Sequence, residues 1–269
     1  MTSWLRGVGL HTGLPCAARW VAREGALRVR RTDGAPSEVV VSLERALETP
    51  RASRVALPDG RSVLTVEHAL SAVTARGCFE GVTLEVAGPE LPLLDGAARL
   101  WAEALGALAP EARGPRWEIP RAARFTVGES ALELSPGEPT VRAWTDLRGH
   151  GLATREVSWE GTWEAYLASL ARSRTFGFAS ELGYFRARGL GQGLDPRAVV
   201  VFEEGRAHPA FAAPTDPGEP YRHKLLDVLG DLGLLGGRVL GALRFERPGH
   251  ARTLALLRQA VREGALRQR

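Results

Sequence analysis

The strongest constraint on the fold comes from residues 221–231, whose sequence is YRHKLLDVLGD. If this segment is a helix, His223, Asp227 and Asp231 follow one another at intervals of about one turn, so that an imidazole and two carboxylates share one face. Leucine and valine occupy the remaining faces, which predicts a helix that is packed on most sides. Buried polar groups need partners, and a divalent cation would be one for this row.

Lys224 is the only lysine in the sequence, because arginine fills the other basic positions. A lone ammonium directly after His223 indicates a place where a compact charge with an adjustable pKa is needed and a guanidinium is not. The alternative is that one lysine survived the arginine bias by chance.

Bulk properties exclude several classes of protein. The length of 269 residues allows one large or two moderate domains. The net charge of +4 suggests an anionic ligand, but the arginines are scattered, so no nucleic acid partner is expected. Cys16 and Cys78 are too few for a disulfide framework. No apolar run reaches the ~18 residues of a transmembrane segment and no signal peptide is apparent, so we expect a cytoplasmic protein.

Strand-like and helix-like segments are mixed without a regular βαβ rhythm. In the first half we expect strands over 27–31, 38–43, 62–66 and 82–87, and helices over 67–76 and 96–108, the second capped by Asp95. Residues 109–115, with two prolines and a glycine, are the best linker. In the second half we expect strands around 123–127, 131–134, 140–144, 153–159, 198–202 and 239–245, and helices over 162–171, 180–188, 221–231 and from 251 onward. This order predicts two α+β domains, residues 1–113 and 114–269.

A second polar group, TVEH at residues 65–68, lies where a predicted strand meets a helix. Alone it is compatible with a capped helix start and an interior imidazole, and the pair His223–Asp227 alone with a surface hydrogen bond. Together, however, His68, His223 and Asp227 form a set of two histidines and one carboxylate with an open fourth position, which is typical of catalytic zinc. Glu67 would then be free to take a proton from water.

Two further residues have alternative interpretations. His250 directly precedes the terminal helix and is either a surface turn residue or, if Asp231 sets its tautomer and raises its pKa, a proton donor to a leaving group. Thr175 lies between a basic helix end and two phenylalanines. Its hydroxyl is either a cap or a donor to an oxyanion.

With these residues gathered, the sequence resembles the UDP-3-O-acyl-N-acetylglucosamine deacetylases, the zinc amidases of lipid A biosynthesis. Dispersed stretches match the pattern of that family in its order. They are residues 7–13, 65–68, 92–96, 174–178, 188–190, 222–231 and 249–250, so that the resemblance covers nearly the whole chain.

The resemblance implies a fold of two α+β domains of similar topology, each a helix layer packed on a β-sheet, with the active site at the domain interface. It implies a Zn²⁺ ion and a role for each polar residue noted above. The implied roles are zinc ligand for His68, His223 and Asp227, general base for Glu67, general acid or oxyanion stabiliser for His250, orientation of that histidine for Asp231, oxyanion donor for Thr175 and charge stabiliser for Lys224.

In that family an insertion after the TFGF stretch forms an apolar passage for an acyl chain. Here it corresponds to a small βαβ insert at about residues 177–202. The resemblance implies substrate contacts from Phe176, Ala179, Leu182, Ala198 and Val200, although these residues are also compatible with the core of the βαβ unit. We therefore expect a monomeric enzyme that releases acetate from a UDP-sugar carrying an acyl chain.

Two alternatives remain open from the sequence. One is a zinc amidohydrolase of the same fold that acts on another N-acyl amino sugar. It is favoured by a short loop at 191–196 and by the lack of the family's aromatic-Asp-His-Pro stretch around 146–151. The other is a non-catalytic binding homologue, against which the presence of the complete set of polar residues argues.

Overall fold

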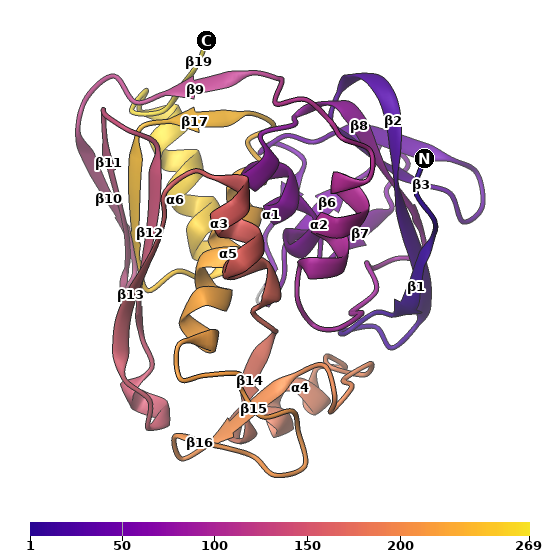
Figure 1. Cartoon of the computed structure of the whole chain (residues 1–269), viewed down its shortest axis with the longest axis vertical. Helices are drawn as coiled ribbons and strands as arrows, with labels where there is room; N and C mark the ends of the chain where they lie inside the picture. Colours follow the sequence, from indigo (N-terminus) through magenta and orange to yellow (C-terminus); the bar gives the residue numbers. More distant parts are fainter. Residues whose placement is uncertain (50) are drawn as a thin grey trace.

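The computed structural model describes residues 1–49 and 51–269, which form two five-stranded sheets with helices between them (Figure 1). The first sheet comes from the N-terminal third of the chain. Its strands, in spatial order, are β1 (Leu5–Val8), β2 (Pro15–Ala26), β8 (Glu80–Ala87), β3 (Arg28–Arg31) and β4 (Ser37–Val40).

The second sheet repeats this arrangement in the C-terminal half. Its order is β10 (Ala123–Val127), β11 (Ser130–Ser135), β18 (Ala242–Glu246), β12 (Thr140–Asp146) and β13 (Thr154–Trp159). In each sheet the third and fourth strands pair in parallel, β8 with β3 and β18 with β12, while the other pairs are antiparallel. The two sheets therefore have the same topology, although their sequences show no residue-level repeat.

The helices fill the space between the sheets (Figure 1). They are α1 (Glu67–Arg76), α2 (Arg99–Gly106), α3 (Trp163–Ala168), α5 (Glu219–Gly233) and α6 (His250–Arg262). One apolar cluster runs through both sheets and this helix layer, from Trp20 and Leu84 through Leu70 and Leu229 to Phe245. None of the helices that the structure describes is long and apolar enough to cross a bilayer.

Three small sheets complete the fold. An insert at the bottom of Figure 1 contains β14 (Phe176–Phe178), the 3₁₀ turn η3 (Ala179–Glu181), α4 (Leu182–Ala187), β15 (Val200–Glu203) and β16 (Arg206–Ala207). The others are β5 (Ala46–Leu47) with β6 (Arg54–Ala56) and β7 (Ser62–Leu64), and β17 (Arg238–Leu240) with β9 (Arg116–Glu118) and β19 (Arg267–Gln268). The 3₁₀ turns η1 (Arg148–His150) and η2 (Leu170–Arg172) lie in connections.

The mixture of helices and sheets confirms the α+β class, and the helices expected over 67–76 and 221–231 are present. The helix expected from residue 96 is shorter: it begins at Arg99, and Asp95 does not cap it. The Asp95 carboxylate accepts a hydrogen bond from the N–H of Ala97 at 3.2 Å and pairs with Arg99 instead. The reason is that Gly96, with a φ of 77°, turns the chain before the helix can start.

The strands differ from the prediction in two places. The long strand β2 was not predicted, because its second half is polar and contains Gly25. The single strand expected over 239–245 is divided at Gly241, whose φ is 134°. At that point the chain leaves β17 in one sheet and enters β18 in another, a change that only glycine tolerates easily.

Candidate active site

Helices α1 and α5 meet at the centre of the molecule, and both contribute polar side chains there. Glu67 and His68 are the first two residues of α1, so their positions depend on how the chain enters this helix. Thr65, two residues before Glu67, has a φ of 60°, which is strained for a β-branched residue. Its hydroxyl donates to the fully buried Glu90 carboxylate at 2.7 Å, and this bond stabilises the strained corner.

His68, His223 and Asp227 form a buried group that fits a metal ion. Their donor atoms all lie within 4.8 Å of one another. The Nδ1–H of His223 donates to the carbonyl of Ser173 at 2.9 Å, which leaves the lone pair on Nε2. That Nε2 lies 3.3 Å from Asp227 Oδ1, so the free nitrogen points into the group.

The protonation states of these three side chains suit metal binding. Burial, helped by the neighbouring His223, lowers the pKa of His68 to about 3. Burial also lowers the pKa of His223, although Asp227 opposes the shift. For Asp227, burial alone would raise the pKa, but His223 and Lys224 outweigh it and lower the pKa below its usual value. At neutral pH the set is therefore two neutral imidazoles and one carboxylate, as divalent zinc prefers.

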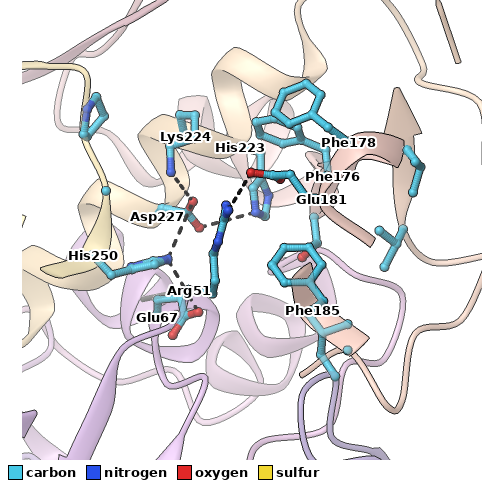
Figure 2. Close-up of a pocket in the computed structure, with 18 of the residues that line it drawn as sticks. Arg51, Glu67, Phe176, Phe178, Glu181, Phe185, His223, Lys224, Asp227 and His250 are labelled. Carbon is cyan, nitrogen blue, oxygen red and sulfur yellow. Dashed lines mark hydrogen bonds and ion pairs between the residues drawn. The ribbon is translucent and has the colours of Figure 1, made fainter. Parts of the chain in front are cut away.

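Glu67 and His250 lie next to each other beside this group (Figure 2). The Nδ1 of His250 lies 2.9 Å from Asp231 Oδ1. Its Nε2 lies 3.9 Å from Glu67 Oε1 and 4.0 Å from Asp227 Oδ2 (Figure 2). Since a carboxylate accepts the Nδ1–H, the Nε2 faces the other acidic groups. At this distance Glu67 and His250 do not hydrogen-bond to each other, so Oε1 and Nε2 are both free to contact a reacting group.

Burial shifts the pKa values of Glu67 and His250 in opposite directions, because it favours the neutral form of both a carboxyl and an imidazole. It raises the pKa of Glu67 to about 7, with His250 opposing and Asp227 adding to the shift. Burial would lower the pKa of His250, but the carboxylates of Asp231 and Glu67 outweigh it and raise the pKa to about 9. Near neutral pH the site therefore holds an ionisable base beside a protonated acid.

Lys224 and Thr175 also lie at this site. The Nζ of Lys224 is 3.0 Å from Asp227 Oδ2, so the only lysine is adjacent to the ligand group. The hydroxyl of Thr175 donates to the carbonyl of Gly96 at 3.0 Å and, like the residue's N–H, is held by that carbonyl. Thr175 lines the same cavity as the other predicted site residues.

The cavity has a volume of about 860 Å³, and two sets of its lining residues, called here the polar branch and the apolar branch, differ in chemical character. One branch is polar and is lined by Asp146, Arg148, His150, Arg247 and Arg252. The other branch is apolar and is lined by Leu182, Phe185, Leu194, Val199 and Val201. Figure 2 shows Arg51 extending through the cavity toward Glu181, with which it forms an ion pair beside Phe185.

The residues predicted to contact an acyl chain are only partly those of the apolar branch. Phe176 and Leu182 line the cavity, but Ala179, Ala198 and Val200 do not. Successive residues of a strand point to opposite faces, so Val199 and Val201 face the cavity. Val200 packs on the other side with Phe178 and Phe202. Ala198 and Ala179 pack in the same apolar cluster as Val199 and Val201 but do not themselves line the cavity.

Several residues of the site had no signal in the sequence. They are Arg51, Ser53, Glu181, Phe185, Val199, Val201 and His150, of which the last stacks on Phe178 with ring centroids 3.5 Å apart. Ser53 is the clearest case, because a serine within the stretch RASR matches no motif. Its contacts depend on two helices that are distant in the chain.

Comparisons with known proteins identify the family of the chain. Residues 2–262 match the family model described as LpxC: UDP-3-O-acyl N-acetylglycosamine deacetylase. The chain is 32% identical over 256 residues to the UDP-3-O-acyl-N-acetylglucosamine deacetylase of Syntrophotalea carbinolica, covering 91% of this chain and 81% of the relative. It is 33% identical over 273 residues to that of Phenylobacterium zucineum, covering 98% and 92%. The chain therefore belongs to the UDP-3-O-acyl-N-acetylglucosamine deacetylase family.

Proposed function

We propose that this protein hydrolyses the acetamide of a UDP-3-O-acyl-N-acetylglucosamine and releases acetate and the free glucosamine amine. The observation that carries the proposal is the placement of Glu67 and His250 together beside the buried group His68, His223 and Asp227. A base, an acid and a ligand set for a metal ion are the parts that metal-assisted amide hydrolysis needs.

The residues present fit zinc as the metal ion. Two imidazoles and one carboxylate are a ligand set of catalytic zinc, and the Ser173 carbonyl fixes the tautomer of His223 that leaves Nε2 free. When bound, zinc would supply Lewis-acid activation of water and of the amide carbonyl. His68, His223 and Asp227 would hold it.

Glu67 acts as the general base in this proposal. Its Oε2 accepts a hydrogen bond from the Ser53 N–H at 2.9 Å, which leaves Oε1 facing His250 and the ligand group. Glu67 takes the proton of the attacking water, and burial raises the pKa of its carboxyl to about 7, which suits proton transfer near neutral pH.

His250 protonates the leaving amine from Nε2, since Nδ1 is bonded to Asp231. In its charged form it also stabilises negative charge on the tetrahedral carbon's oxygen. Lys224 adds a second positive charge beside Asp227. Thr175 joins as an oxyanion donor only after its hydroxyl rotates away from the Gly96 carbonyl.

The two branches of the cavity match the two ends of the substrate. The polar branch carries Arg148, Arg247 and Arg252, and such guanidinium groups suit a diphosphate. Arg148 and Arg247 both pair with Asp146, whereas Arg252 makes no hydrogen bond or ion pair with any residue that the structure describes. The apolar branch suits an acyl chain, which would lie against Phe185, Val199 and Val201.

We further propose that the chain divides into two domains, residues 1–113 and 114–269, with the insert near 177–202 belonging to the second. The equal topology of the two five-stranded sheets supports this division. Glu67 and His68 would then come from one domain and the remaining site residues from the other, so that the reaction takes place between them.

The proposal is tested by measuring acetate release from UDP-3-O-acyl-N-acetylglucosamine before and after removal of metal with a chelator. We expect turnover by the untreated enzyme, loss of turnover in the chelator, and recovery on addition of one equivalent of Zn²⁺ per chain. Acetate release that continues undiminished in metal-free protein would contradict a metal-dependent mechanism.

The substrate is tested by comparing the acylated compound with UDP-N-acetylglucosamine, which has the same acetamide but no acyl chain. We expect a much larger kcat/KM for the acylated compound. Equal values would mean that the apolar branch does not bind the acyl chain. Turnover of neither compound, in zinc-loaded protein, would favour another N-acyl amino sugar as substrate.

A further inference from the structure

A buried hydroxyl that the steps above do not use lies directly behind the reacting groups. Ser53 is fully buried. Its N–H donates to Glu67 Oε2 at 2.9 Å, its carbonyl accepts from the N–H of Val66 at 3.3 Å, and its hydroxyl donates to Asp231 Oδ1. All of its polar groups are therefore engaged, and two of them bind side chains to which the mechanism assigns a role.

The direction of the hydroxyl bond follows from counting protons. Ser53 Oγ lies 3.4 Å from His250 Nδ1, but that nitrogen already donates to Asp231 at 2.9 Å. The hydroxyl has one proton, and the carboxylate is the acceptor for it. Asp231 Oδ1 therefore receives two hydrogen bonds, one from Ser53 and one from His250.

Two donors on one oxygen restrict the rotation of the carboxylate. The terminal torsion of an aspartate side chain has a broad minimum, so a single donor leaves the carboxylate plane poorly defined. The plane of the His250 ring follows that of Asp231, and the direction of Nε2 follows the ring. A change at Ser53 would therefore reach the atom that protonates the leaving amine.

Ser53 also connects parts of the chain that are far apart in sequence. It immediately precedes β6, whereas Asp231 is on α5 and His250 begins α6. Its N–H holds the base Glu67 on α1. One residue thus fixes the base and, through Asp231, the acid.

We propose that Ser53 is a positioning residue for the deacetylation, an inference that rests on the proposed function. Its hydroxyl holds Asp231 and, through it, His250, while its N–H holds Glu67. Substitution by alanine removes only the hydroxyl, so the contribution to the acid can be separated from the contribution to the base.

The test is a double-mutant cycle on the zinc-loaded, full-length enzyme. Ser53→Ala should lower kcat for the acylated UDP-sugar about tenfold or more, the scale of one lost hydrogen bond to a charged group, with KM and bound zinc unchanged. Ser53→Thr keeps the hydroxyl and should restore most of kcat. In an Asp231→Asn background Ser53→Ala should cost much less, because the carboxylate that the hydroxyl holds is already absent.

A second readout needs no substrate. The His250 Nδ1–H, bonded to a buried carboxylate, should give a downfield proton resonance in the wild-type NMR spectrum, and Ser53→Ala should shift or broaden it. Thr83→Val, which removes another buried hydroxyl in β8, is the control and should change neither kcat nor this resonance.

Wild-type kcat in Ser53→Ala, an equal loss with and without Asp231, or an unchanged resonance would each overturn the proposal. If Ser53→Ala does not fold, Ser53→Cys, which fills the space with a weak donor, takes its place in the cycle. A wild-type enzyme that releases no acetate would contradict the proposed function instead, and the resonance would still decide the role of Ser53.

Discussion

Glu67 and His250 illustrate how equal burial produces an acid and a base. Both side chains are almost completely buried, which favours the neutral form of each. Glu67 follows this tendency, and its pKa rises to about 7. His250 does not, because burial is outweighed by Asp231 and Glu67, and its pKa rises to about 9. The neighbouring charges, and not the degree of burial, separate the two roles.

Replacement of Glu67 by glutamine tests its role as the general base. Glu67→Gln keeps the shape and the acceptor for the Ser53 N–H but cannot take a proton. We expect kcat for acetate release to fall about 10²- to 10⁴-fold, with KM and zinc content unchanged. Glu263→Gln, a change near the end of α6 outside the cavity, is the control and should leave kcat unchanged. Normal turnover by Glu67→Gln would show that another group is the base.

The pH dependence of the reaction tests the role of His250. Asp231 is the leading group that raises the pKa of His250, so Asp231→Asn should lower that pKa. The protonated form, which donates to the amine, is then lost at a lower pH as the pH rises. The alkaline limb of kcat/KM, which reports the free enzyme, should therefore move toward lower pH. An alkaline limb that stays in place would mean that His250 is not the group that must be protonated.

At the scale of elements, the site depends on the close approach of α1 and α5. A Cβ on Gly230 would collide with the backbone of Glu67, and one on Gly233 would lie 2.9 Å from the Cβ of Leu70. These two glycines let α5, with His223 and Asp227, lie directly against the helix that carries His68. Helix axes come this close only where one side chain is missing.

Gly230→Ala should therefore separate the ligands. The added methyl group has no space beside the Glu67 carbonyl, so we expect the free energy of unfolding to fall by about 1–3 kcal/mol. Zinc affinity, measured by competition with a chromogenic chelator, should fall with it. Gly106→Ala in α2, where the nearest atom is 3.8 Å away, is the matched control and should be neutral or slightly stabilising. Unchanged zinc affinity in Gly230→Ala would show that the ligand group tolerates a shift of α1.

At the scale of the whole molecule, the cavity is enclosed by segments that lie far apart in the chain. Arg51 comes from the N-terminal half and pairs with Glu181 of the insert, and its guanidinium lies 4.9 Å from the ring centre of Phe185. This bridge holds the apolar branch against the rest of the site (Figure 2). The pair is partly exposed, with 39% of the Arg51 side chain accessible, so its direct contribution to folding stability is small.

We expect the effect of this bridge in substrate binding. Arg51→Ala should raise KM for the acylated UDP-sugar about 2- to 5-fold and leave kcat/KM for UDP-N-acetylglucosamine unchanged. Arg197→Ala is the matched control, because Arg197 pairs with Asp195 in the same insert but does not line the cavity. Equal changes for both substrates would place the effect of Arg51 outside the apolar branch.

The sequence alone determined the features that depend on local geometry. The one-turn spacing of His223, Asp227 and Asp231 fixes a polar row on a helix whatever surrounds it, and the structure has that helix. The junction that presents Glu67 and His68 was likewise predictable, since a strand, a turn and a helix follow one another there. Gly77, the residue that ends α1, has the positive φ expected of a glycine at a helix C-terminus.

Only the tertiary structure decided which distant groups meet. Ser53 contacts Glu67 and Asp231 because a short segment is packed between two helices, and no periodic pattern encodes such a contact. Whether Val200 or its neighbours Val199 and Val201 line the apolar branch depended on the register of one strand, which reverses every side chain when it shifts by one residue. Local sequence thus determines which side chains lie on one face of a helix or strand, and tertiary packing determines which distant residues those side chains contact.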